Sequence, residues 1–135
     1  MRCSAAVTGL AALVVAGCGT PVPEVATDEP VSYAAHLEAL VVAHCLGCHE
    51  SEEAKAKLVL DPGVGYERLV GPRSVQVPEM ALVEPGDPER SYLWLKLQHA
   101  AEKGKGMPRT LTGAKKLRES ELDLYRRWIE GGAKP

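Results

Sequence analysis

The chain has 135 residues, which is enough for one small domain once any processed segment is removed. Aromatic residues make up only 4% of the chain and Phe is absent. We therefore expect a small hydrophobic core that is stabilised by a cofactor, a metal or a cross-link. The formal net charge of −2 lacks the basic excess that nucleic-acid-binding proteins usually carry, and we expect no nucleic-acid partner.

Residues 1–17 have the layout of a secretory signal peptide. Arg2 supplies one positive charge, residues 11–16 form an apolar run, and small residues lead to Cys18. The run is too short to cross a bilayer as a helix, which takes about 20 apolar residues. The ending VAGC at residues 15–18 resembles the lipobox of bacterial lipoproteins, in which cleavage exposes a cysteine that then carries a diacylglycerol. An ordinary signal peptide containing a cysteine is the alternative.

This N-terminus predicts an exported protein, lipid-anchored through Cys18 to a bacterial membrane on its periplasmic or cell-surface side. Residues 18–30 comprise the acylated cysteine and a segment with three prolines, three acids and no apolar period, which predicts a flexible tether. The folded domain is expected over residues 31–135. Because Cys3 leaves with the signal peptide, Cys45 and Cys48 are the only cysteines expected in that domain.

A helical pattern begins at Ser32, which suits an N-cap, and places on one face Leu37, Leu40, Val41 and Cys45. This helix leads into CLGCH at residues 45–49, the attachment pattern of c-type haem. In a helix or tight helical turn, positions i, i+3 and i+4 share a face, so Cys45, Cys48 and His49 point the same way. We expect one covalent haem c, with thioether bonds to both cysteines and His49 as an axial iron ligand.

Three other interpretations of this cluster stay open. A zinc site takes four ligands, and the chain has no second cysteine pair, although His36, His44 and His99 are available. A thioredoxin-like redox pair is typically set in a β-α-β pattern, which is absent from the sequence. A disulfide between Cys45 and Cys48 would be strained and would close almost no loop. Each of these fits the sequence less well than haem attachment does, and His44 is expected to have no ligand role.

The remaining elements are marked by glycine and proline. These residues are frequent from about residue 54 to 86, which predicts loops with short helical turns. Asp87 as N-cap, Pro88 at the first helical position and Gly104 at the end predict a helix between them. A loop or short helix is expected over residues 105–119.

The last predicted helix begins at a near capping box of Ser120 and Asp123 and ends at Gly131. It presents a wide apolar face, made of Leu122, Leu124, Tyr125, Trp128 and Ile129. No strand pattern is present anywhere in the sequence. The expected fold class is therefore all-α, with a helix at each end and long Pro/Gly loops between.

Met107 is the favoured second axial ligand. It stands between Gly106 and Pro108, and glycine lets a backbone approach a flat ligand closely while proline stiffens the loop that presents the sulfur. Met80, His99 and an open sixth position are the alternatives. The site predicted from the sequence therefore comprises Cys45, Cys48, His49 and Met107.

These motifs resemble class I monohaem cytochromes c, and most closely the planctomycete-type cytochrome c domains of exported bacterial proteins. The matching stretches are CLGCH at 45–49, KLVLDP at 57–62, VEPGDPERSYLWLKL at 83–97, MP at 107–108 and RRWIEGGA at 126–133. The resemblance implies a class I cytochrome c fold, with helices around one covalently bound haem. It also implies His49 and Met107 as axial ligands and terminal helices packed against each other. Lys57 departs from the pattern, because the family usually has Gly there.

A haem iron held by His and Met has no open coordination position, so we predict outer-sphere one-electron transfer at the membrane surface and no enzymatic reaction. The alternative is a haem-based sensor or an accessory haem subunit of a larger complex, in which Met107 dissociates. Residues 103–118 contain six basic residues and no acid, and they bracket Met107. This predicts steering of an acidic redox partner toward the haem. A solvated loop, or compensation of the haem propionates, is the alternative for these charges.

Overall fold

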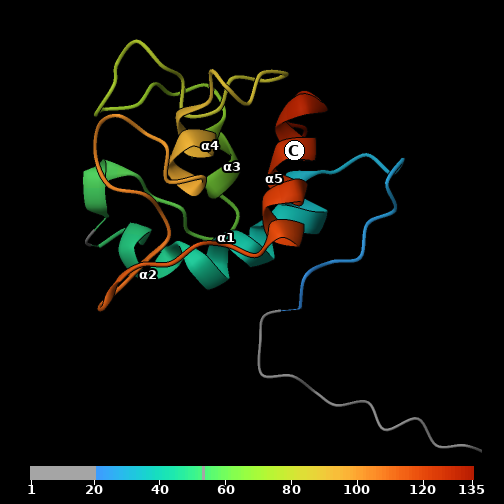
Figure 1. Ribbon diagram of the computed structural model, residues 1–135, viewed down its shortest axis with the longest axis horizontal. Coiled ribbons are helices and arrows are strands. Elements are labelled where there is room, and N and C mark those ends of the chain that lie inside the picture. Colours follow the sequence, from blue (N-terminus) through green and yellow to red (C-terminus); the bar gives the residue numbers. More distant parts are fainter. Residues whose placement is uncertain (1–20, 53) are drawn as a thin grey trace, which may run out of the picture.

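The computed structural model describes residues 21–52 and 54–135 (Figure 1). The predicted signal peptide at residues 1–17 and the predicted lipidation site at Cys18 lie outside this part of the chain. No helix within the described ranges is long and apolar enough to cross a membrane.

The first helical region confirms the predicted N-cap and apolar face. A π-helix, η1, spans Tyr33–Leu37, and α1 (Glu38–His44) and α2 (Leu46–His49) follow it. The Ser32 hydroxyl accepts the backbone N–H of Ala35 at 3.4 Å, which satisfies one of the donors that a helix start leaves open. Leu37, Leu40 and Val41 are all buried, as their helical spacing predicts.

The middle of the chain is mostly loop, with the 3-10 turn η2 (Lys55–Lys57) and the short helix α3 (Gly65–Leu69). Within η2, Ala56 and Lys57 have φ angles of 55° and 58°, in the left-handed region. A side chain there costs on the order of 1 kcal/mol, whereas glycine adopts this conformation freely. The conformation of Lys57 thus explains why glycine would suit this position.

The helix predicted between Asp87 and Gly104 is shorter, and α4 spans Tyr92–Leu97. The Asp87 carboxylate accepts the backbone N–H of Arg90 at 3.1 Å and so caps the turn that precedes α4. The N–H of Tyr92 donates to the carbonyl of Ala81 at 3.0 Å, so an adjacent loop satisfies the start of the helix. At the other end, His99 has a φ of 61°, which stops the helix well before Gly104.

The last helix, α5, spans Glu119–Glu130 and ends at Gly131 as predicted. Its capping box is made by Arg118 and Glu121 rather than by Ser120 and Asp123, because the carboxylate of Glu121 accepts the backbone N–H of Arg118 at 2.8 Å. Of the predicted apolar face, Leu124, Tyr125, Trp128 and Ile129 are buried and Leu122 is half-buried.

The prediction of an all-α fold of the class I cytochrome c type is wrong, because residues 109–114 form a small antiparallel sheet. Strand β1 (Arg109–Thr110) pairs with β2 (Gly113–Ala114), and the fold is therefore mixed. Each strand has two residues, too few to show a period-two pattern in the sequence. Gly113, at a φ of 133°, lets the chain reverse over Leu111 and Thr112.

The core lies where α5 packs against η1 and α4. Trp128 is completely buried, and its ring centroid lies 5.7 Å from that of Tyr33 in η1. The carbonyl of Lys134 accepts both the Trp128 Nε1–H at 2.7 Å and the Tyr33 backbone N–H at 3.0 Å. One carbonyl near the C-terminus thus ties the two terminal helices together.

Residues 21–30, the described part of the predicted tether, have no regular structure and run beside α5 (Figure 1). The guanidinium of Arg127 donates to the carbonyls of Val25 at 3.3 Å and Glu29 at 2.8 Å. Val22 and Val25 also pack against the core. This segment is therefore held on the domain from about residue 22 onward.

Candidate functional site

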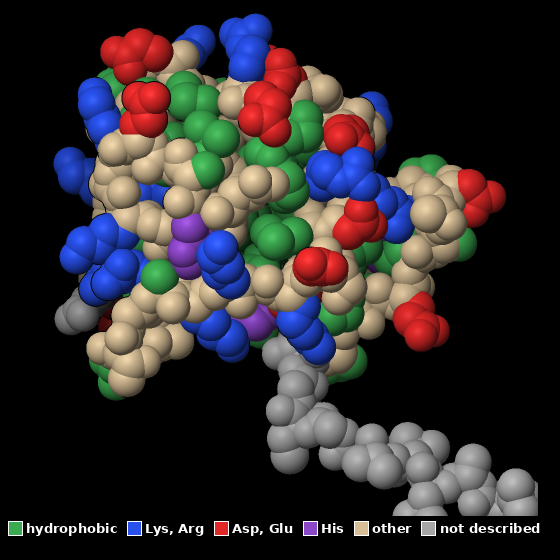
Figure 2. All heavy atoms as spheres, viewed as in Figure 1, with side chains coloured by type: hydrophobic (Ala, Val, Ile, Leu, Met, Phe, Trp, Pro, Cys, Tyr) green, Lys and Arg blue, Asp and Glu red, His purple; other side chains and the backbone are tan. Residues whose placement is uncertain are grey.

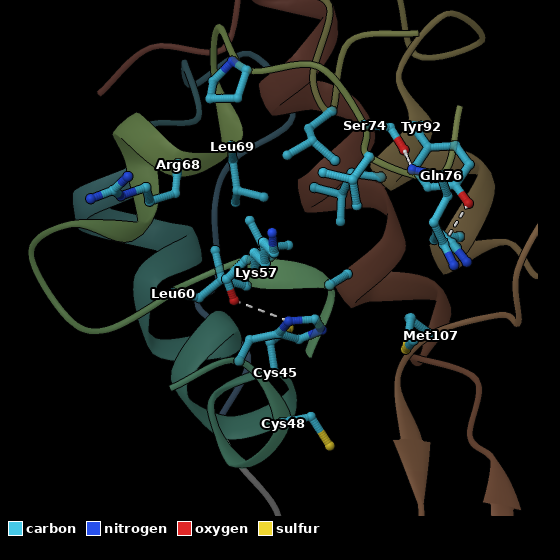
Figure 3. Close-up of a pocket in the computed structure, with 18 of the residues that line it drawn as sticks. Cys45, Cys48, Lys57, Leu60, Arg68, Leu69, Ser74, Gln76, Tyr92 and Met107 are labelled. Atoms are coloured by element: carbon cyan, nitrogen blue, oxygen red, sulfur yellow. Dashed lines mark hydrogen bonds between the residues drawn. The ribbon is translucent and has the colours of Figure 1, made fainter. Parts of the chain in front are cut away.

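A cavity of about 240 Å³ lies between α2, the following loop, α4 and residues 107–109 (Figure 3). All four predicted site residues of the domain line it, namely Cys45, Cys48, His49 and Met107. Its apolar walls include Leu58, Leu60, Leu69, Leu82, Leu93 and Leu97. The structure thus brings together residues from both halves of the sequence.

Cys45 and Cys48 stand on a tight helical turn at the junction of α1 and α2. The carbonyl of Cys45 accepts the backbone N–H groups of Cys48 and His49, both at 3.1 Å. Both thiols are free, and burial, followed by repulsion from a charged Cys48, raises the pKa of the Cys45 thiol to about 12. Redox-active cysteines have a lowered pKa, so this environment favours an anchoring role over a thioredoxin-like pair.

His49 is oriented by the loop that follows α2. Its Nδ1 lies 3.2 Å from the carbonyl of Leu58, and since a carbonyl can only accept, Nδ1 carries the proton and Nε2 has a lone pair for a metal. Burial lowers the pKa of the His49 imidazole, which outweighs the opposite effect of the Leu58 carbonyl. His49 is therefore neutral near pH 7, the state in which imidazole binds a metal.

Met107 lies across the cavity from the helical turn that carries the cysteines (Figure 3). Its backbone N–H donates to the carbonyl of Lys96 at 2.9 Å, which fixes the loop to the end of α4. Of the side chains considered for the second axial position, Met107 lines the cavity, whereas Met80 and His99 are not among its lining residues.

Two polar residues of α4 that line this cavity, Tyr92 and Lys96, were not predicted from the sequence. Lys96 is only 6% exposed, and its ammonium donates to the carbonyl of Lys105 at 2.8 Å and lies 5.1 Å from the centre of the Tyr92 ring. Burial lowers the pKa of Lys96. Their four-residue spacing could have indicated both residues, because it places Lys96 on the apolar face of α4, where a lysine is unusual.

The histidines of the zinc alternative are engaged elsewhere. His36 Nδ1 accepts the N–H of Ser32 at 3.0 Å, and His44, which borders the cavity, places Nε2 2.9 Å from the carboxylate of Glu121. Across residues 21–52 and 54–135, no three His, Cys, Asp or Glu side chains gather into a group able to hold a metal ion. With His44 held by Glu121, the donors left at the cavity are the thiols of Cys45 and Cys48, the imidazole of His49 and the thioether of Met107.

Comparisons with protein-family models, with curated proteins and with solved structures found no match. The function is therefore argued from the cavity itself. The residues present fit a c-type haem, because two free thiols precede an imidazole whose Nδ1 is already hydrogen-bonded, and a thioether lies across an apolar cavity.

Proposed function

We propose that this protein binds one covalent haem c and transfers single electrons. The observation that carries the proposal is that Cys45, Cys48, His49 and Met107 line one cavity with apolar walls. Bound there, a haem supplies an iron that alternates between its ferrous and ferric states. If His49 and Met107 both held the iron, no position on it would be open to a substrate, which favours electron transfer over catalysis.

The residues around the cavity have separate tasks in this proposal. Cys45 and Cys48 anchor the macrocycle, and the carbonyl of Leu58 orients His49 toward it. The surrounding leucines keep water away, which together with a thioether ligand favours the reduced iron and raises the reduction potential.

Covalent attachment is the first testable consequence. When the chain is exported in a host with haem-attachment machinery, we expect one haem bound through two thioether bonds, read by intact mass and by the haemochrome spectrum in pyridine. Cys45→Ser and Cys48→Ser should each shift the haemochrome band toward that of a singly attached haem, and the double variant should lose covalent haem. Cys18→Ser is the matched control, because it should keep the haem and lose only the lipid. A fully processed native chain without covalent haem would overturn the proposal.

We infer export and lipid anchoring at Cys18, the residue that ends the lipobox-like sequence. Val22 packs against the core, so about four residues separate the lipid from the first point held on the domain. At about 3.1 Å per residue, four residues of extended chain would reach on the order of 12 Å. The domain would therefore stay close to the bilayer.

We propose an acidic redox partner, because the segment around Met107 is basic. Lys103, Lys105, Lys115 and Lys116 are exposed, and Arg109 borders the cavity. Figure 2 shows Lys and Arg side chains gathered along one edge of the molecule. A local positive field of this kind accelerates encounter with a negative surface and weakens as salt screens it.

The reduction rate by an anionic iron–cyanide complex should therefore fall as ionic strength rises, as measured by stopped flow. The double variant Lys115→Glu/Lys116→Glu should slow this reaction several-fold at low salt. The control Arg90→Glu/Lys134→Glu changes the net charge equally at exposed positions outside the segment and should have a smaller effect. Equal slowing by both double variants would show that net charge, rather than this segment, sets the rate.

A further inference from the structure

The end of α4 has a histidine where helices commonly have glycine. His99 follows the C-cap residue Gln98 and has a φ of 61°, a conformation that glycine adopts freely and other residues adopt at a cost in free energy. The N–H of Ala100 returns to the carbonyl of Leu95 at 2.9 Å, which closes the helix end. A residue other than glycine in this strained conformation suggests that its side chain has a function.

The His99 side chain contacts the loop that presents Met107. Its Nε2–H donates to the carbonyl of Met107 at 3.0 Å. Its ring also lies against Gly106, where an added Cβ would come within 2.4 Å of the His99 Cγ. Gly106 is therefore required for space, and His99 and Gly106 fit each other as a pair.

His99 is the last of three residues, four and then three positions apart, whose side chains contact alternate carbonyls of the following loop. The Tyr92 hydroxyl lies 2.8 Å from the carbonyl of Lys103, the Lys96 ammonium 2.8 Å from that of Lys105, and His99 Nε2 3.0 Å from that of Met107. One side of α4 and its end thus contact alternate carbonyls of the loop at residues 103–107.

We propose that Tyr92, Lys96 and His99 form a clasp that holds the Met107 loop over the cavity, with His99 as the positioning residue for Met107. This inference rests on the proposed function, since it assigns the clasp the task of keeping the thioether in place. It gives His99 an indirect role through the backbone of Met107, in contrast to the ligand role considered from the sequence.

His99→Gly tests this because it separates strain from positioning. The variant relieves backbone strain but also removes one hydrogen bond, and because these effects on stability have opposite signs, the melting temperature of the haem-loaded protein should change little. It also removes the contact with the Met107 carbonyl, so hydrogen exchange at the Met107 amide should quicken at least tenfold. Imidazole should bind the oxidised protein at least tenfold more tightly, because a released Met107 leaves the iron open. His99→Gln retains an N–H donor and should restore part of the native behaviour.

The pairing with Gly106 supplies a second test. Gly106→Ala should clash with the His99 ring and also tighten imidazole binding, whereas adding it to His99→Gly should cause little further change. Unchanged exchange and imidazole binding in His99→Gly would overturn the clasp, as would a large fall in its melting temperature. Faster exchange without tighter imidazole binding would support the clasp but contradict Met107 as an iron ligand, so the two proposals fail in different ways.

Discussion

Replacing Met107 with Ala is expected to let carbon monoxide bind the reduced protein, whereas the native protein should show no spectral change under the gas. In the proposed site the Met107 thioether would bind the iron, and Ala would leave the iron without that ligand. The reduction potential should fall in the same variant, because a thioether ligand favours the reduced iron. Visible spectra with and without carbon monoxide, and a redox titration, measure both effects.

Met80→Ala is the matched control for this experiment. Met80 is half-buried and does not line the cavity, so its removal should leave the carbon monoxide result and the potential unchanged. A native protein that binds carbon monoxide readily would instead favour the sensor function, in which Met107 dissociates. A Met107→Ala protein that behaves like the native one would show that another group occupies the sixth position.

Glu121→Gln is expected to lower the free energy of unfolding by about 3 kcal/mol at pH 7. Glu121 is 2% exposed, and its carboxylate lies 2.8 Å from the Arg118 guanidinium and 2.9 Å from His44 Nε2. Burial alone would raise the pKa of this carboxyl, but hydrogen bonds from Arg118 and His44 outweigh it and lower the pKa to about 2. Since His44 precedes Cys45, the contact joins α5 to the turn that carries both thiols.

The direction of the pH dependence follows from this shift. The pKa of Glu121 in the folded protein lies below its ordinary value of 4.5, so its contribution is complete above about pH 4.5 and is lost as the pH falls toward 2. Urea unfolding at pH 7 and pH 3 should therefore show a difference between the native and Glu121→Gln proteins that shrinks in acid. Glu119→Gln, an exposed change on the same helix, is the control and should have little effect at either pH. An equal difference at both pH values would contradict this account.

Local features of the sequence predicted the helix boundaries that depend on local contacts. Ser32 caps the first helical region and Gly131 ends α5, because each satisfies or frees backbone groups within one turn. The burial of Leu37, Leu40, Trp128 and Ile129 followed from helical spacing alone, since an apolar face has to be covered.

The predictions that failed depended on contacts between distant segments. The start of α4 was placed too early because the pairing of Tyr92 with Ala81 is not visible in local sequence. The hairpin was missed because its strands have only two residues each. The α5 capping box was misplaced because Arg118 does not belong to the usual capping residues.

The sequence by itself determined the donor set of the candidate site, because the spacing of Cys45, Cys48 and His49 places them on one face of any helical turn. It also singled out Met107 by its neighbours Gly106 and Pro108. Only the tertiary structure decided that these residues line one cavity, and that His99 contacts the Met107 loop instead of the cavity. The physical reason is range: helical spacing acts over four residues, whereas the match between α4 and the loop at residues 103–107 requires the chain to fold back on itself.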